Sequence, residues 1–364
     1  MSINEIIIFV MVIFAVLGAI DRIIGNKIGL GEQFEEGILA IGTLALSMVG
    51  IISLAPVLAS LLQPVVVPFF NILGADPAMF AGSILANDMG GAPLAFELAS
   101  SLEAAQFGGL IVGSMLGPTI VFTLPVALGL IKEQDRKYMA TGVLAGVITI
   151  PIGSLVGGLA AGFPFIMIIK NLVPIIIFAV VIALGLWKFP NAMIKGFTVF
   201  GRFIVIIITI GLIAGIVEAL TGFTLIPGLN PLSEGFEIVA DISIVLSGAF
   251  PLVFAITRIF KKPLLKLGKI LGMNDVAAAG LVASLANSIP MFNMVKDMDR
   301  RGKIINFAFA TSAAFVFGDH LGFTAGFDSS MIFPMIVGKI TGGITAVILA
   351  LIIARGMKGE EHGD

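Results

Sequence analysis

Long apolar runs separated by short polar clusters dominate this 364-residue chain. A helix needs about 20 mostly apolar residues to cross the hydrocarbon core of a membrane. Cutting the chain at its polar clusters predicts nine spans, at Ile6–Ile24, Gly37–Leu61, Phe107–Ile131, Met139–Ala161, Phe165–Trp187, Ile194–Leu220, Phe236–Ile259, Ile304–Thr324 and Met331–Ala354. The apolar piece 63–71 is too short to cross, so we expect it at the membrane interface or at the start of a hairpin.

Two segments inside this pattern are polar and are broken by glycine and proline. Ile72-Leu73-Gly74 opens the first, and Ile270-Leu271-Gly272 opens the second, 198 residues later. Ala86-Asn87 in the first matches Ala286-Asn287 in the second. Because irregular backbone is tolerated in a bilayer only where protein or a cavity covers it, we predict two re-entrant hairpins, near residues 76–104 and 274–300.

Charge distribution indicates that the two copies are inverted. Residues 47–130 contain no Lys or Arg, whereas residues 245–328 contain nine. Because Lys and Arg accumulate in cytoplasmic loops, equivalent segments of opposite bias are expected to enter from opposite faces. The matching also extends upstream, where Gly37 corresponds to Gly235 and Gly50 to Gly248.

This repeat predicts the domain organisation. We expect a first inverted repeat at residues 1–161, a linking span at 162–193, a second repeat at 194–358 and a cytoplasmic tail at 359–364. Placing the basic loops inside gives an extracellular N-terminus, a cytoplasmic C-terminus and an odd number of spans. The fold class is therefore an all-α polytopic membrane protein with inverted repeats.

The amino-acid composition excludes several classes of function. Hydrophobic residues make up 58% of the chain and charged residues 12%, and the mean hydropathy is +1.11, which are values of an integral membrane protein. There is no basic tract for nucleic acid, no cysteine, and only two histidines. We therefore expect no nucleic-acid partner, no thiolate or histidine metal site and no cofactor.

Inverted repeats with paired hairpins are typical of secondary transporters, whose halves exchange conformations to give alternating access. No phosphate-cradling loop supports ATP-driven pumping. The pattern therefore predicts a secondary transporter or facilitator and leaves the coupling ion undetermined. Paired glycines such as Gly108-Gly109 are expected mainly to let helices pack closely.

Candidate site residues are the polar groups that fall at membrane depth. Asp88 lies in the turn of the first hairpin, where it is expected to cap backbone N–H groups, contact substrate, or do both. Asn87, Asn287 and Ser288 occupy equivalent positions and can both donate and accept hydrogen bonds.

A second candidate is the pair Asp319 and His320 in the eighth predicted span. A carboxylate beside the only intramembrane histidine is suited to binding a cation or relaying a proton, and a buried pair alone contributes little stability. Lys339 in the last span is expected to neutralise Asp319 or Asp328, which competes with any role of Asp319 in binding a cation.

Three blocks of sequence, ANDMGGAPLAFEL, LANSIPMFNM and FVFGDHLGFTAGFD, resemble the ethanolamine-utilisation permease family of bacteria. The resemblance runs nearly end to end, and it implies a multi-pass protein of the bacterial cytoplasmic membrane that admits ethanolamine for breakdown. It supplies no catalytic residues. The paired hairpins are also similar in architecture to those of elevator-type transporters.

Ethanolamine is mostly an ammonium ion at neutral pH, and it suits a site with a carboxylate, neutral acceptors and an aromatic face. We expect Asp88 and Asp319 to share the ammonium group. Neutral and aromatic contacts are expected from the remaining candidates, which are Asn87, Asn287, Ser288, Phe292, Asn293 and His320. We expect the lipid bilayer and a second copy of the chain, in a homo-oligomer, as further partners.

Other classes of function remain open at this point. A proton- or sodium-coupled carrier of an organic anion or nucleoside would bind the anion through Lys339 and the hairpin dipoles. An aspartyl intramembrane hydrolase would require a glycine at Val316 in the run Val316-Phe317-Gly318-Asp319, so an enzyme is not expected. A third alternative is a passive scaffold or receptor, which would transport no solute across the membrane.

Overall fold

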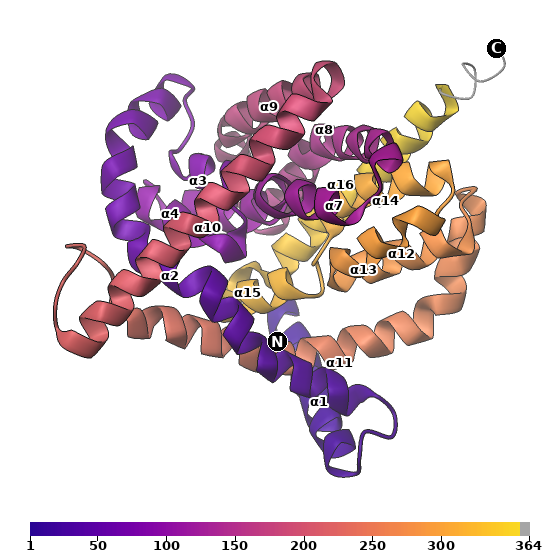
Figure 1. Ribbon diagram of the computed structural model, residues 1–364, viewed down its shortest axis with the longest axis horizontal. Coiled ribbons are helices and arrows are strands. Elements are labelled where there is room, and N and C mark those ends of the chain that lie inside the picture. Colours follow the sequence, from indigo (N-terminus) through magenta and orange to yellow (C-terminus); the bar gives the residue numbers. More distant parts are fainter. Residues whose placement is uncertain (357–364) are drawn as a thin grey trace.

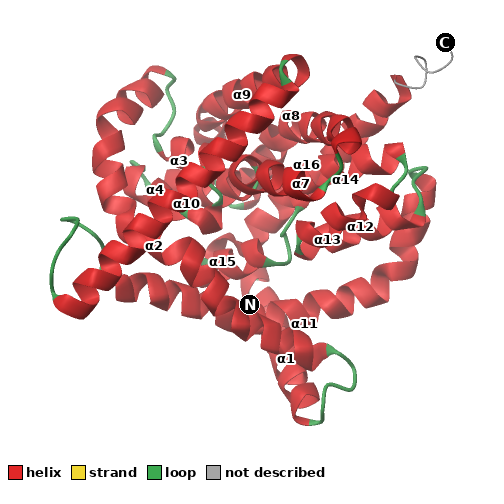
Figure 2. Ribbon diagram, in the orientation of Figure 1, coloured by secondary structure: helices red, strands yellow, loops and turns green. Residues whose placement is uncertain are grey.

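The computed structural model describes residues 1–356, and within them all regular structure is helical (Figures 1 and 2). The predicted tail, 359–364, lies outside the described residues. The α-helices are α1 (Ile3–Ile23), α2 (Leu30–Ile72), α3 (Ala78–Ile84), α4 (Gly91–Leu98), α5 (Leu102–Gln106), α6 (Leu116–Pro118), α7 (Leu124–Leu130), α8 (Arg136–Ala160), α9 (Phe165–Lys188), α10 (Pro190–Thr221), α11 (Leu232–Ile270), α12 (Asp275–Ala286), α13 (Ser288–Met294), α14 (Arg300–Ala313), α15 (Asp319–Phe327) and α16 (Ile332–Gly356).

Eight helical stretches in the described part of the chain are long and apolar enough to cross a membrane. They are Ile3–Ile23, Leu30–Ile72, Leu102–Leu130, Glu133–Ala160, Phe165–Lys188, Pro190–Thr221, Leu232–Ile259 and Ser329–Ala354. The chain is therefore a multi-pass helical protein. The expected ninth span, Ile304–Thr324, is wrong as a continuous helix, because α14 ends at Ala313 and α15 begins at Asp319.

The interruption between α14 and α15 has a definite backbone cause. Phe315 adopts a positive φ of 62°, which takes the chain out of helical geometry. The N–H groups of Phe315 and Phe317 donate to the carbonyls of Ser284 and Leu285, each at 3.0 Å. These bonds to α12 replace the intrahelical bonds that the interruption removes, as a bilayer requires.

The stretch Leu102–Leu130 is also irregular, at the position that corresponds by the 198-residue offset. It contains π-helical turns at Phe107–Ile111 and Thr119–Thr123, with a 3₁₀ turn at Val112–Ser114 between them. Gly117 lies directly against Leu85 of the first hairpin, because a Cβ built there would be 1.9 Å from the Leu85 carbonyl oxygen. Each irregular segment thus contacts the hairpin that precedes it.

Helix α2 is longer than the sequence predicts. It runs without interruption through Pro56, Pro64 and Pro68, so the apolar piece 63–71 forms its last turns rather than a separate interfacial segment. Figure 1 shows its curved course, and proline bends a helix because it removes a backbone hydrogen bond. The helix therefore leads directly to the first hairpin.

Each predicted hairpin consists of two short helices closed at the base by a side chain. In the first, α3 and α4 pack together, and the Asp76 carboxylate accepts from the N–H groups of Ala78 (2.9 Å) and Ser100 (3.0 Å). In the second, α12 and α13 pack together, and Asn274 donates from its side chain to the Asp297 carbonyl at 2.9 Å. Asp76 and Asn274 are separated by 198 residues, so matched positions close both hairpins.

The two longest helices, α2 and α11, pack along one another with reciprocal contacts. Gly37 of α2 lies against Leu246 and Ser247 of α11, whereas Gly235 of α11 lies against Val49 of α2. Residue numbers rise along α2 as they fall along α11, so the helices are antiparallel. The Ser243 hydroxyl strengthens this contact by donating to the Gly37 carbonyl at 2.8 Å.

Two glycines place the neighbouring helices in the same reciprocal way. A Cβ at Gly50 of α2 would lie 1.9 Å from the Ile208 carbonyl oxygen of α10, and a Cβ at Gly248 of α11 would lie 2.3 Å from the Met11 carbonyl oxygen of α1. Both contacts are with backbone, which cannot move aside as a flexible side chain can.

Gly50→Ala is expected to lower the thermal stability of the purified protein, because overpacking costs about 1–3 kcal/mol. Gly42→Ala is the matched control on the same helix, since no atom lies within 4 Å of its Cβ position. Melting followed by size-exclusion chromatography in detergent measures both variants. An unchanged melting temperature for Gly50→Ala would contradict the packing described.

Candidate functional site

The tip of the first hairpin faces the interruption between α14 and α15 across a small pocket. Its lining comes from both halves of the chain: Ala86, Asp88, Met89, Pro118, Phe122, Phe315, Asp319 and His320. In Figure 1, α15 lies between the α3–α4 hairpin and the α12–α13 hairpin. The pocket is therefore a junction of segments that are far apart in sequence, and its volume is about 40 Å³.

Asp88 is held at the pocket by a tight turn. It belongs to the 3₁₀ turn Asn87–Met89, and Gly90 follows with a φ of 92°, which favours glycine. A Cβ at Gly90 would lie 2.2 Å from the Ile51 side chain, so the turn is pressed against α2. This packing fixes the carboxylate, whose side chain is 16% exposed.

His320 and Lys339 form a buried polar chain behind Asp88. The His320 Nε2 lies 3.9 Å from the Asp88 carboxylate, and its Nδ1 lies 2.9 Å from the Lys339 Nζ. Lys339 also donates a hydrogen bond to the Ser114 carbonyl. With Lys339 as an ammonium donor, a neutral His320 accepts at Nδ1 and directs its Nε2–H toward Asp88.

Lys339 does not pair with Asp319 or Asp328, so the expected ion pairs are wrong. In the described part of the chain its hydrogen-bond partners are His320 and the Ser114 backbone, and Lys339 is 1% exposed. Asp328 instead accepts from the Gln106 side chain at 2.7 Å and from the Ser330 hydroxyl at 2.6 Å. Asp319 is therefore left facing the pocket without a lysine partner.

Asp319 begins α15 and completes the charged lining. With Asp88 it supplies two carboxylates to one pocket, against the single ammonium of Lys339 behind it. In their ordinary ionised forms these groups leave one uncompensated negative charge. Since a buried unpaired charge is costly, the arrangement is suited to receiving a small monovalent cation.

Aromatic rings form the other wall of the pocket. Phe122 and Phe315 meet edge to face with their centroids 5.3 Å apart, and Phe315 also lies 5.2 Å from the His320 ring. Sequence reasoning missed both phenylalanines, because in an apolar chain an aromatic residue carries no distinguishing signal. Lys339 was noticed in the sequence, but its contact with His320 was not.

The three remaining tip residues lie outside the pocket lining. Asn87 is fully buried, and neither its Oδ1 nor its Nδ2 has a hydrogen-bond partner. Asn287 accepts from the Ile289 N–H at 2.8 Å and lines a separate, largely apolar cavity beside α11. Ser288 is fully buried with an unpartnered hydroxyl.

Phe292 and Asn293 are also placed away from the pocket. Phe292 stacks on Phe307 at 5.8 Å and is 1% exposed, as expected for a core residue. Asn293 is exposed on the surface of α13. The structure thus brings together Asp88, Asp319 and His320, and it separates them from the other five candidates. Within residues 1–356 no three His, Asp or Glu side chains cluster as a metal site would require.

Comparison with known proteins gives consistent matches over nearly the whole chain. The family described as "Ethanolamine utilisation protein, EutH" matches residues 3–353. A Listeria monocytogenes protein named "Probable ethanolamine permease EutH" is 69% identical over 333 residues, covering 92% of this chain and 89% of the relative. An Escherichia coli protein of the same name is 51% identical, covering 92% of this chain and 91% of the relative.

A third relative, the "Uncharacterized protein YxeR" of Bacillus subtilis, is 50% identical over 331 residues, covering 91% of this chain and 90% of the relative. No solved structure gives a significant match. The family match spans the pocket residues as well as the helices around them. The chain belongs to the EutH family of ethanolamine utilisation proteins.

Proposed function

We propose that this protein carries ethanolamine, as the ethanolammonium ion, across the bacterial cytoplasmic membrane. The observation that carries the proposal is the small pocket between the two halves of the chain, which the side chains of Asp88 and Asp319 line together. The names of the Listeria and Escherichia relatives, each a probable ethanolamine permease, agree with this substrate. Transport leaves the substrate chemically unchanged, so no catalytic group is required.

The chemistry of the pocket matches both ends of the substrate. An ammonium group offers three N–H donors, which two carboxylates can accept. Phe122 and Phe315 line the pocket, and aromatic rings can add cation–π attraction to an ammonium group, worth about 0.5–2 kcal/mol depending on solvent exposure. The hydroxyl can donate or accept, so neutral His320 is a suitable partner for it.

We further propose that the two halves are inverted repeats and that the hairpins are re-entrant gates, as in elevator-type carriers. The antiparallel packing of α2 on α11 supports inversion, because Gly37 and Gly235 make equivalent contacts across the pair. The matched contacts of Gly50 and Gly248 extend the same relation to α10 and α1. Under this proposal the N-terminus is extracellular and the C-terminus is cytoplasmic.

An organic anion or a nucleoside fits the pocket less well. An anion would need an accessible positive group, but Lys339 is fully buried, bonds His320 and Ser114, and does not line the pocket. Competition of unlabelled ethanolamine against a panel of labelled anions, nucleosides and amines discriminates these carriers directly.

Asp88→Asn and Asp319→Asn are each expected to reduce uptake about tenfold or more, because a hydrogen bond to a charged group is worth about 1.5–3 kcal/mol. The assay is uptake of labelled ethanolamine into proteoliposomes at mildly acidic pH, where little of the amine is uncharged and membrane leakage is small. Proton and sodium gradients are imposed separately to identify any coupling ion.

Glu97→Gln is the control for these variants. Glu97 lies in the same hairpin but is exposed and does not line the pocket, so its loss should leave uptake unchanged. Parental rates in both aspartate variants, with normal insertion into the vesicles, would overturn the assigned site. No flux in the parent would indicate a scaffold or receptor.

Lys339→Met is expected to destabilise the protein by about 1–3 kcal/mol, because it leaves the buried His320 Nδ1 and Ser114 carbonyl without their donor and removes the positive charge behind Asp88. Adding Asp88→Asn removes one carboxylate, so the double variant should regain part of that stability. Thermal melting of the parent, both single variants and the double variant forms a mutant cycle. Strict additivity of the two changes would mean that Asp88 and Lys339 are not coupled.

Inverted topology predicts that Ser100→Cys and Lys269→Cys label from opposite sides of the membrane. Both positions are exposed near the bases of the two hairpins, and the chain has no natural cysteine to interfere. An impermeant maleimide applied to intact cells and to inverted vesicles reads out each side. Labelling of both cysteines from the same side would exclude inversion.

A further inference from the structure

A large groove lies on the outside of the helix bundle, and it shares no residue with the Asp88–His320 pocket. Its volume is about 850 Å³, within the range of small-molecule sites. Its walls come from α8, from the C-terminal end of α9, from the N-terminal end of α10 and from Ile353 of α16. Ile148, Leu184 and Trp187 on its walls are all substantially exposed, so the groove opens on the outer surface of the helix bundle.

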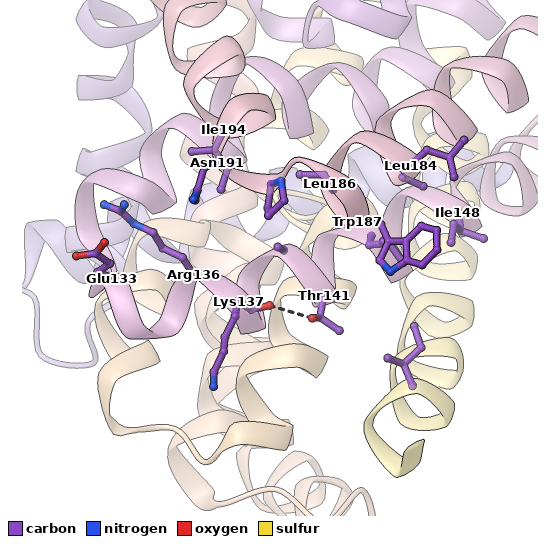
Figure 3. A pocket seen from close by; sticks show the side chains of 15 residues that line it. Glu133, Arg136, Lys137, Thr141, Ile148, Leu184, Leu186, Trp187, Asn191 and Ile194 are labelled. Carbon is purple, nitrogen blue, oxygen red and sulfur yellow. Dashed lines mark hydrogen bonds between the residues drawn. The ribbon is translucent and has the colours of Figure 1, made fainter. Parts of the chain in front are cut away.

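The groove has two chemically different ends. Figure 3 shows the charged side chains of Glu133 and Arg136 on one side and Leu184, Trp187 and Ile148 on the other. This division matches a ligand with a charged head and apolar chains. Tryptophan is enriched at the level of lipid headgroups, where its ring is partly wet and partly apolar.

Positive charge predominates at the polar end. The segments 132–137 and 188–195, which meet there, contain the basic residues Lys132, Arg136, Lys137, Lys188 and Lys195 and the acidic residues Glu133 and Asp135. Asp135 is already neutralised, because Lys303 donates to its carboxylate at 2.5 Å. Among the charged residues that line the groove itself, Glu133 opposes Arg136 and Lys137, so this end of the groove carries a net positive charge and attracts anions.

Arg136 supplies an unsatisfied donor inside the groove. Its Nε–H is buried and has no hydrogen-bond partner among the described residues. A buried guanidinium N–H without an acceptor is costly, and planar guanidinium groups bind phosphate oxygens through paired hydrogen bonds. Asn191 and Thr141 line the same groove and can add neutral hydrogen bonds to a headgroup.

We propose that this groove is a binding site for an anionic phospholipid. The phosphate is bound by Arg136, and Lys137 contributes a second positive charge. The acyl chains lie on the apolar wall made by Leu144, Ile148, Leu184 and Ile353. Basic pockets between membrane helices are recognised sites for such headgroups, and here the lipid would join the α9–α10 corner to α8 and α16.

The test measures lipid binding by the full-length purified protein. Phosphatidylglycerol and phosphatidylcholine are titrated separately, and bound lipid is counted by native mass spectrometry while thermal stability is followed in parallel. Phosphatidylglycerol is expected to bind and to raise the melting temperature, whereas phosphatidylcholine does so weakly. Arg136→Gln is expected to bind phosphatidylglycerol with an affinity at least about tenfold lower than that of the parent.

Two further variants separate the groove from general surface charge. Lys132→Gln removes the same charge from the same loop but lies outside the lining, so it should bind as the parent does. Ile148→Trp fills the apolar wall without changing charge, and it should also weaken binding. Arg136→Lys keeps the charge and should bind at an intermediate level, which guards against misfolding of the glutamine variant.

Several outcomes would overturn the proposal. If Arg136→Gln bound phosphatidylglycerol as tightly as the parent, Arg136 would not be the headgroup contact. If Lys132→Gln and Arg136→Gln lost the same amount of affinity, the effect would come from general surface charge and not from the groove. Stabilisation by inorganic phosphate alone would identify a bare anion site rather than a lipid site. Dimerisation that excludes lipid from the groove would show that a second copy of the chain occupies it.

Discussion

The constraint on which this structure depends is that every backbone break inside the bilayer must find a hydrogen-bond partner. The interruption after Ala313 meets this requirement by bonding through Phe315 and Phe317 to the end of α12. The corresponding irregular stretch of the first half presses Gly117 against Leu85 at the end of α3. Breaks and hairpin tips therefore have to converge, and a polar pocket at their junction follows from that convergence.

Sequence reasoning could predict that the two polar segments form short, interrupted helices, but it could predict neither irregular stretch that contacts them. These segments can be recognised in the sequence because glycine, proline and polar residues interrupt an apolar pattern there. By contrast, the run Ala313-Ala314-Phe315-Val316 is uniformly apolar and contains no residue that breaks a helix. Its departure from helical geometry is stabilised by carbonyls about thirty positions earlier, and such long-range bonding leaves no local trace.

The charged residues illustrate the same division. Asp88, Asp319 and His320 could be selected from the sequence because ionisable groups at membrane depth are rare and expensive. Their partners could not be selected, since Lys339 lies 19 residues from His320 and 225 residues from the Ser114 carbonyl that it bonds. The hydropathy pattern indicates how deep in the membrane a residue lies, but the direction in which its side chain points depends on how the helices pack.

The division of the pocket between the two halves bears directly on how a carrier of this kind would work. Asp88 comes from the first hairpin, whereas Asp319 comes from the start of α15 in the second half of the chain. An ammonium ion held between them binds most tightly when the two carboxylates are close. A ligand shifts a conformational equilibrium only through such differential affinity. Under the proposed function, ethanolammonium therefore favours the arrangement in which hairpin tip and α15 are together, and its release accompanies their separation.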